Sequence, residues 1–144
     1  MSNKNFFIIL NIIIPILAGS SLYYLLSPNV IFVKAIDDTI GTLHTLNINN
    51  NVVLSFIRCY FLDMLWAYAL VFALFFILQH GKQALTLTFF TAFLFSTFME
   101  ILQLTDFAGG TFDIIDIAVE GAAEAIAIFI ILFFTRRNFH EEKK

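Results

Sequence analysis

The chain has 144 residues, of which 60% are hydrophobic and only 13% are charged, and its formal net charge is −3. Soluble domains average about 45–50% apolar and about 25% charged residues, so a water-soluble fold of this size has too little interior for this sequence. No basic patch suits a nucleic-acid partner, and the single cysteine, Cys59, excludes an internal disulfide. We therefore predict an all-α integral membrane protein with one domain over residues 1–144.

The first apolar segment, residues 6–26, carries no charge and has the length of about 20 residues that a bilayer requires. Lys4 in front of it and Ala18-Gly19-Ser20 within it give it some likeness to a signal peptide. The apolar run continues past these small residues to Leu26. We therefore interpret it as a retained first transmembrane helix.

The segment 27–52 is a long polar connection that still contains regularly spaced apolar residues. Positions 32, 33, 36, 40 and 43 fit one face of a helix. We predict a short amphipathic helix here, in the first outer loop, lying on the membrane surface or over the mouth of the bundle. A plain solvated connector is the alternative.

Three further spans are predicted at residues 55–79, 84–104 and 112–134. The polar turn 80–83 separates the second span from the third, and a turn with two glycines, 107–111, separates the third from the fourth. Most Lys and Arg residues lie near the chain ends or in the 80–83 turn, and the positive-inside rule places such segments in the cytoplasm. We predict four spans with both termini cytoplasmic and the 105–111 turn facing outward.

Acidic side chains gather in residues 96–125, a stretch without Lys or Arg. Glu100 and Gln103 are three residues apart and therefore share a helix face. The next helix carries a stripe of acids at spacings of three, four and four residues: Asp113, Asp116, Glu120 and Glu124. Acids inside membrane proteins usually face the bundle interior or a wet cavity, and they mark functional sites.

Helix geometry places most of these acids in the outer half of the bundle. At a rise of about 1.5 Å per residue, Glu120 lies roughly 10 Å and Glu124 roughly 16 Å below Asp113. Asp63 and Glu100 each lie within about two turns of the same outer face. We predict that one outward-open, ligand-binding pocket is formed by Asp63, Glu100, Gln103, Thr111, Asp113, Asp116 and Glu120.

Carboxylates this close together cannot all stay ionised without partners. Protonation, Arg58 as a counter-ion, or a bound cation would each resolve the conflict. If a metal binds, an all-oxygen site favours Ca²⁺ or Mg²⁺, with Glu100, Asp113 and Asp116 as its ligands. A purely structural role is the alternative, with Asp113 as a helix N-cap and Glu124 as a contact between closely packed helices.

The pattern Glu100-x-x-Gln103, followed by Gly110-Thr111-Phe112-Asp113-x-x-Asp116-x-x-x-Glu120-Gly121, resembles the signature of the VanZ-like family. These are small bacterial membrane proteins named for a teicoplanin-resistance protein. The family usually has Arg where Gly110 stands and Asn where Glu120 stands, so the pocket here is more negative. The resemblance implies a location in the bacterial cytoplasmic membrane and a role at the cell envelope that can include glycopeptide or lipoglycopeptide resistance.

Three functions are consistent with this pattern of acidic residues. The first is a binding protein of the VanZ type, with its pocket open to a membrane lipid or to a lipid-linked or amphiphilic envelope molecule. The second is an enzyme acting on a lipid head group, with Glu100, Asp113 and Asp116 as metal ligands or acid–base groups. The third is a small proton-coupled transporter. We predict the binding protein, because no Ser/His pair supports catalysis and residues 126–134 beyond the acids are wholly apolar.

Overall fold

The computed structural model describes residues 3–26, 39, 52–78, 83–105 and 112–141. The helices are α1 (Asn3–Leu26), α3 (Val52–Phe56), η1 (Ile57–Phe61), α4 (Leu62–Leu78), α5 (Ala84–Leu102) and α6 (Ile114–Glu141). Four helical segments are long and apolar enough to cross a membrane: Lys4–Leu26, Val52–Leu78, Ala84–Leu102 and Ile114–Thr135. The predicted all-α architecture with four helices of spanning length is confirmed.

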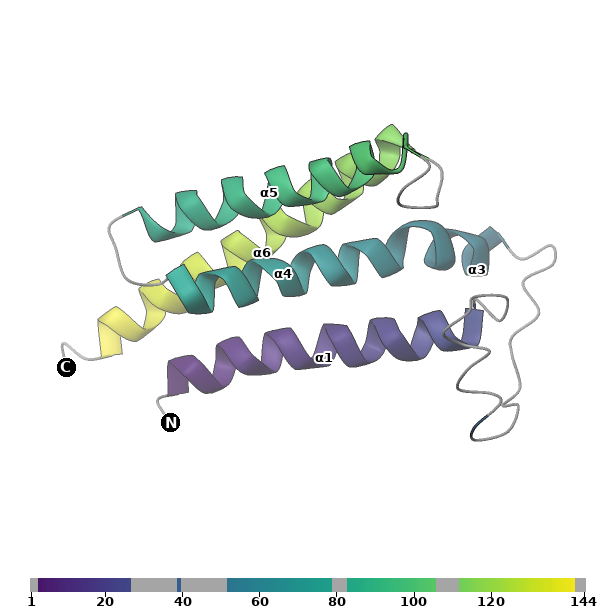
Figure 1. Ribbon diagram of the computed structural model, residues 1–144. Coiled ribbons are helices and arrows are strands. Elements are labelled where there is room, and N and C mark those ends of the chain that lie inside the picture. The colour runs from purple at the N-terminus through teal and green to yellow at the C-terminus, as the bar shows by residue number, and fades with distance from the viewer. Residues whose placement is uncertain (1–2, 27–38, 40–51, 79–82, 106–111, 142–144) are drawn as a thin grey trace.

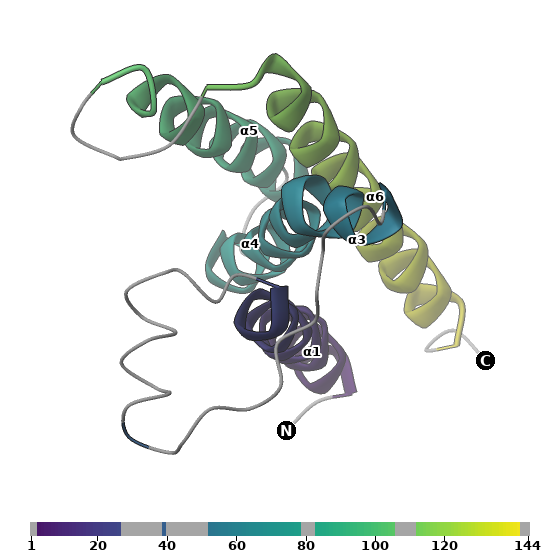
Figure 2. The same ribbon diagram turned by 90° about the vertical axis from the view of Figure 1, so that its right-hand side faces the viewer.

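The helices run up and down along one bundle (Figure 1). Both chain ends lie at one end of the bundle, and the C-terminal end of α1 and the start of α3 lie at the other. Helix α4 is central, because it packs against α1, α5 and α6, while α5 also packs against α6. Figure 2, which looks along the bundle, shows α1 on one side of α4 and the α5–α6 pair on the other.

Two glycines bring neighbouring helices close together. A Cβ atom at Gly19 of α1 would lie 3.6 Å from Nε1 of Trp66 on α4, and one at Gly121 of α6 would lie 3.1 Å from Cε2 of Phe93 on α5. Such small residues are typical of membrane helix interfaces, where close packing rather than the hydrophobic effect holds helices together.

A polar contact also links α1 to α4. The Tyr68 hydroxyl donates a hydrogen bond to Asn11 Oδ1 at 2.6 Å, and the Asn11 side-chain amide donates to the Phe7 carbonyl at 2.9 Å. This hydrogen bond joins Tyr68 to a residue of the first helix. Its hydroxyl is therefore satisfied within the bundle.

The apolar core fills the half of the bundle nearer the chain termini. Its buried members come from all four spans: Ile8, Val71, Phe72, Phe75, Ala92, Ala127 and Ile131. Phe7 of α1 stacks on Phe134 of α6 with ring centroids 3.8 Å apart, and the Lys4 ammonium lies 5.6 Å from the centroid of the Phe75 ring. The buried acids lie in the other half, which also buries Leu26 and Leu62 and which we call the polar end.

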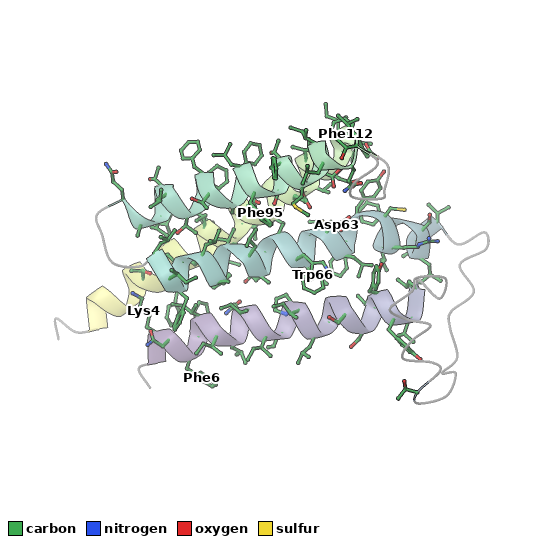
Figure 3. All side chains as sticks on the ribbon, viewed as in Figure 1. Lys4, Phe6, Asp63, Trp66, Phe95 and Phe112 are labelled. Atoms are coloured by element: carbon green, nitrogen blue, oxygen red, sulfur yellow. The ribbon has the colours of Figure 1, made fainter. Side chains whose placement is uncertain are left out.

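Large apolar side chains cover the outside of the bundle. Phe6 and Phe95 are 57% and 52% exposed, and Phe6 points away from the bundle (Figure 3). Leu17, Ile77 and Phe129 are between 61% and 70% exposed. A monomeric soluble protein rarely exposes so much contiguous apolar surface, whereas lipid tails cover it readily.

The predicted span boundaries agree with the structure to within a few residues where the helices are described. The second span begins earlier than expected, at Val52 rather than residue 55. Helix α1 continues through Pro15 without interruption. The predicted amphipathic helix near residues 32–43 lies outside the described residues.

Candidate functional site

Acidic side chains from three helices meet at the polar end of the bundle. Asp63, near the start of α4, interacts electrostatically with Asp116 on α6 and with Glu100 on α5. Glu120 interacts with these same three carboxyl groups and with Glu124. Figure 3 shows Asp63 on its helix near this end of the bundle. We call this set, together with Asp113, the acidic cluster: Asp63, Glu100, Asp113, Asp116, Glu120 and Glu124.

The Glu100 carboxylate is held at the C-terminal end of α5 by its neighbour Gln103. Gln103 Nε2 donates a hydrogen bond to Glu100 Oε1 at 2.6 Å, as expected for residues three apart on one helix face. Glu100 is only 6% exposed, and its second oxygen, Oε2, is buried without a hydrogen-bond partner. The pair therefore presents one fixed oxygen and one open oxygen.

Asp113 caps the N-terminus of α6. Its Oδ1 accepts a hydrogen bond from the backbone N–H of Ile115 at 2.9 Å, which satisfies one of the amides that a helix start leaves unpaired. The structural role proposed for Asp113 is therefore present. The residue also interacts with Tyr60 through a side-chain hydrogen bond, so capping and membership in the cluster are compatible.

Two more carboxyl groups of α6 turn toward the same region. Asp116 and Glu120 are four residues apart and therefore lie on one helix face. Oδ1 of Asp116 and Oε2 of Glu120 are both buried without a hydrogen-bond partner. A buried polar atom without a partner costs about 1–3 kcal/mol, more if charged, which favours a bound group that satisfies these oxygens.

Glu124 lies deepest in the cluster. It is fully buried, and Ser96 of α5 donates a hydrogen bond to its Oε1 at 2.8 Å. Ala123 and Ala127 beside it are buried as well. Glu124 therefore makes the helix–helix contact that its alanine-rich surroundings suggested, but its Oε2 is also without a partner.

Tyr60 is a site residue that sequence reasoning missed. It lies in η1, a five-residue π-helical segment between α3 and α4, and it interacts with Asp113 and Asp116. Segments of π-helix are rare and are frequent at functional sites. The spacing in the sequence could have identified Tyr60, because it lies three residues before Asp63 and therefore on the same helix face. Ser96 lies four residues before Glu100 and could have been identified in the same way.

Several predicted features are not found or fall outside the described residues. Arg58 is exposed, and within the described residues no ion pair joins it to a carboxylate. Among the same residues, no group of three or more His, Cys, Asp or Glu side chains has an arrangement that could hold a metal ion. Thr111 and the adjacent glycine turn lie outside the described part of the chain.

Comparison with known proteins adds no relative. No protein-family model, curated protein or solved structure matches the chain.

Proposed function

We propose that the chain is a VanZ-like protein of the bacterial cytoplasmic membrane whose acidic cluster binds a cationic group of a lipid-linked or amphiphilic envelope molecule. The observation that carries this proposal is the meeting of carboxyl groups from α4, α5 and α6 with buried oxygens that lack partners, at Glu100, Asp116 and Glu120. Acids placed inside a membrane bundle are costly, which favours a functional reason for keeping six of them together.

The charge of the cluster determines the ligand chemistry. No described Lys or Arg side chain pairs with these acids, so a ligand gains most by bringing positive charge or several hydrogen-bond donors. An organic ammonium group can contact separate carboxylates without the tight, regular coordination that Mg²⁺ requires. Because the described acids form no group suited to a metal ion, we favour an ammonium-type head group over Ca²⁺ or Mg²⁺.

The membrane orientation follows from the positive-inside rule. Lys4 lies at the end of the bundle that holds both chain termini, and most other Lys and Arg residues lie in the terminal segments or the 80–83 turn. With that end in the cytoplasm, the acidic cluster faces outward. An amphiphile in the outer leaflet can then reach the cluster with its head group while its tail stays in lipid.

The arrangement of the core disfavours the transporter. Beyond Glu124, the buried face of α6 continues with Ala127 and Ile131, which belong to the apolar core. A proton or ion path through the membrane needs polar groups along its length. The described residues therefore support a site open on one side, and binding a drug-like envelope amphiphile there is how the protein would contribute to glycopeptide or lipoglycopeptide resistance.

The test uses Glu100→Gln and Asp116→Asn, which remove one charge each and keep the side-chain volume. Native mass spectrometry of the purified protein with its co-purified lipids should show loss of bound amphiphile in both variants. A charge-assisted contact of about 1.5–3 kcal/mol corresponds to about a 10- to 100-fold weaker affinity. Membrane insertion should be unchanged, since removing a charge eases insertion.

Thr105→Ala is the matched control. Thr105 is an exposed polar residue after the same end of α5, and its hydroxyl donates a hydrogen bond to the Leu102 carbonyl at 2.6 Å. This variant should bind like the wild type. Full binding by both Glu100→Gln and Asp116→Asn would show that the cluster serves packing alone.

A further inference from the structure

Glu124 is the most deeply buried carboxyl group of the acidic cluster, and one of its two oxygens has no hydrogen-bond partner among the described residues. Glu124 is fully buried, and its Oε1 accepts the 2.8 Å hydrogen bond from Ser96. Its Oε2 is buried and has no partner. This bond comes from a neighbouring helix, so the carboxyl group is fixed in place and its open oxygen is fixed with it.

Neither protonation state of Glu124 removes the need for a partner at Oε2. An ionised carboxylate leaves Oε2 without a donor or cation, and a protonated carboxyl group needs an acceptor for its O–H. A buried group in either condition is costly in a low-dielectric interior. None of the described residues gives Oε2 a partner, which favours a bound ion or water at this oxygen.

Glu120 provides a second open oxygen on the same face of α6. It lies one helical turn before Glu124 on α6, so the two side chains leave the same face, and the two carboxyl groups interact electrostatically. Oε2 of Glu120 is also buried without a partner. The described cationic side chains are engaged or located elsewhere, since Lys4 lies over Phe75 and Arg58 is exposed.

We propose that Glu120 and Glu124 bind a small monovalent cation of the Na⁺ type between α5 and α6, with Ser96 positioning the Glu124 carboxylate. Oxygen donors suit hard cations. Two neighbouring carboxyl groups do not both stay ionised without partners, so the pair with one proton carries a single negative charge, which a monovalent ion balances. The ion neutralises the inner end of the acidic cluster and gives both open oxygens a partner. The site shares Glu120 with the ligand-binding region, but the sodium response of thermal unfolding tests it without any envelope ligand.

Because the ion binds the folded bundle, it should stabilise the bundle. We would follow thermal unfolding of the detergent-purified protein through the fluorescence of Trp66, the only tryptophan, in NaCl and in choline chloride at equal ionic strength. For a chain of this size, sodium at about 100 times its Kd should raise Tm by about 5 °C or more, and the rise should saturate.

Glu124→Gln should abolish the sodium-dependent rise in Tm, and Ser96→Ala should shift its midpoint to higher sodium. Asp113→Asn is the control of matched charge. It removes one carboxylate at the outer end of α6, Asn remains a good N-cap, and Asp113 is not among the groups that act on Glu120 or Glu124. The control should keep the full rise.

Equal Tm of the wild type in sodium and in choline would overturn the proposal. So would an undiminished sodium response in Glu124→Gln, or a saturable response to MgCl₂ without one to NaCl. If Glu124→Gln does not fold, an unchanged midpoint in Ser96→Ala would count equally against the site.

Discussion

At the scale of single residues, three carboxyl groups of the acidic cluster are held by specific hydrogen bonds. Gln103 holds Glu100, Ser96 holds Glu124, and the amide of Ile115 holds Asp113. The partner fixes the carboxyl group in space, and Glu100 and Glu124 each keep one buried oxygen without a partner among the described residues, which is the oxygen that we propose a ligand or ion contacts. This division explains how acids can be both structural and functional.

The same scale gives a prediction for the α1–α4 interface. Tyr68→Phe removes the donor to Asn11 and leaves Asn11 Oδ1 without its hydrogen bond. We expect the free energy of unfolding to fall by about 1 kcal/mol, the usual net value of such a bond, measured by denaturation in mixed micelles.

Tyr23→Phe is the control, because Tyr23 lies on α1 and no hydrogen bond is described for its hydroxyl. It should change stability little. If Tyr23→Phe lowered the free energy of unfolding as much as Tyr68→Phe does, the hydrogen bond to Asn11 would make no specific contribution to stability.

Sequence spacing could predict the pairs within one helix but not those between helices. Glu100 with Gln103, and Asp113 at a helix start, follow from the helical repeat alone. The contacts of Tyr60 with Asp113 and of Ser96 with Glu124 depend on how each helix is rotated about its axis. That rotation is set by packing over the whole interface, which no local pattern reveals.

At the scale of elements, composition and length were sufficient to find the spans, because each must provide about 20 apolar residues. They could not reveal η1, since a π-helical turn has no distinctive composition and arises from one extra residue within a helix. This turn matters because Tyr60 lies within it. The predicted loop helix near 32–43 stays a prediction.

Helix packing predicts opposite responses at two glycines. Alanine at Gly19 would make an ordinary contact of 3.6 Å with Trp66 and would favour the helix, so we expect a gain of about 0.5–1 kcal/mol. A Cβ atom added at Gly121 would lie only 3.1 Å from the Phe93 ring. Leucine there would force α5 and α6 apart, at a cost of about 1–3 kcal/mol.

Unfolding in mixed micelles, followed by Trp66 fluorescence, measures both changes. The Gly121→Leu variant should also weaken the Ser96–Glu124 contact, because the same two helices make it. Equal destabilisation by Gly19→Ala and Gly121→Leu would contradict the packing described for these interfaces.

At the scale of the whole molecule, the helices run up and down along one bundle (Figure 1), and the acidic cluster extends along α6 from Asp113 to Glu124, where the apolar core begins with Ala127. The topology proposed from charge counts has both termini in the cytoplasm. In a Cys59→Ser background, single cysteines at Asn49 and at Ala108 should react with an impermeant thiol reagent applied outside intact cells, and one at Gly81 should not. External labelling at position 81 alone would reverse the orientation.

The most direct test of the central claim measures the access and charge of the cluster together. In the Cys59→Ser background, the Asp116→Cys side chain would be treated from outside with a cationic and an anionic methanethiosulfonate reagent of similar size. Acid-lined sites raise the local concentration of cations, with rate effects of about 10- to 1,000-fold. We expect the cationic reagent to react at least about 10 times faster, and addition of Glu100→Gln to reduce this ratio. Equal rates for the two reagents, or reaction only from the cytoplasmic side, would contradict an outward-facing acidic site.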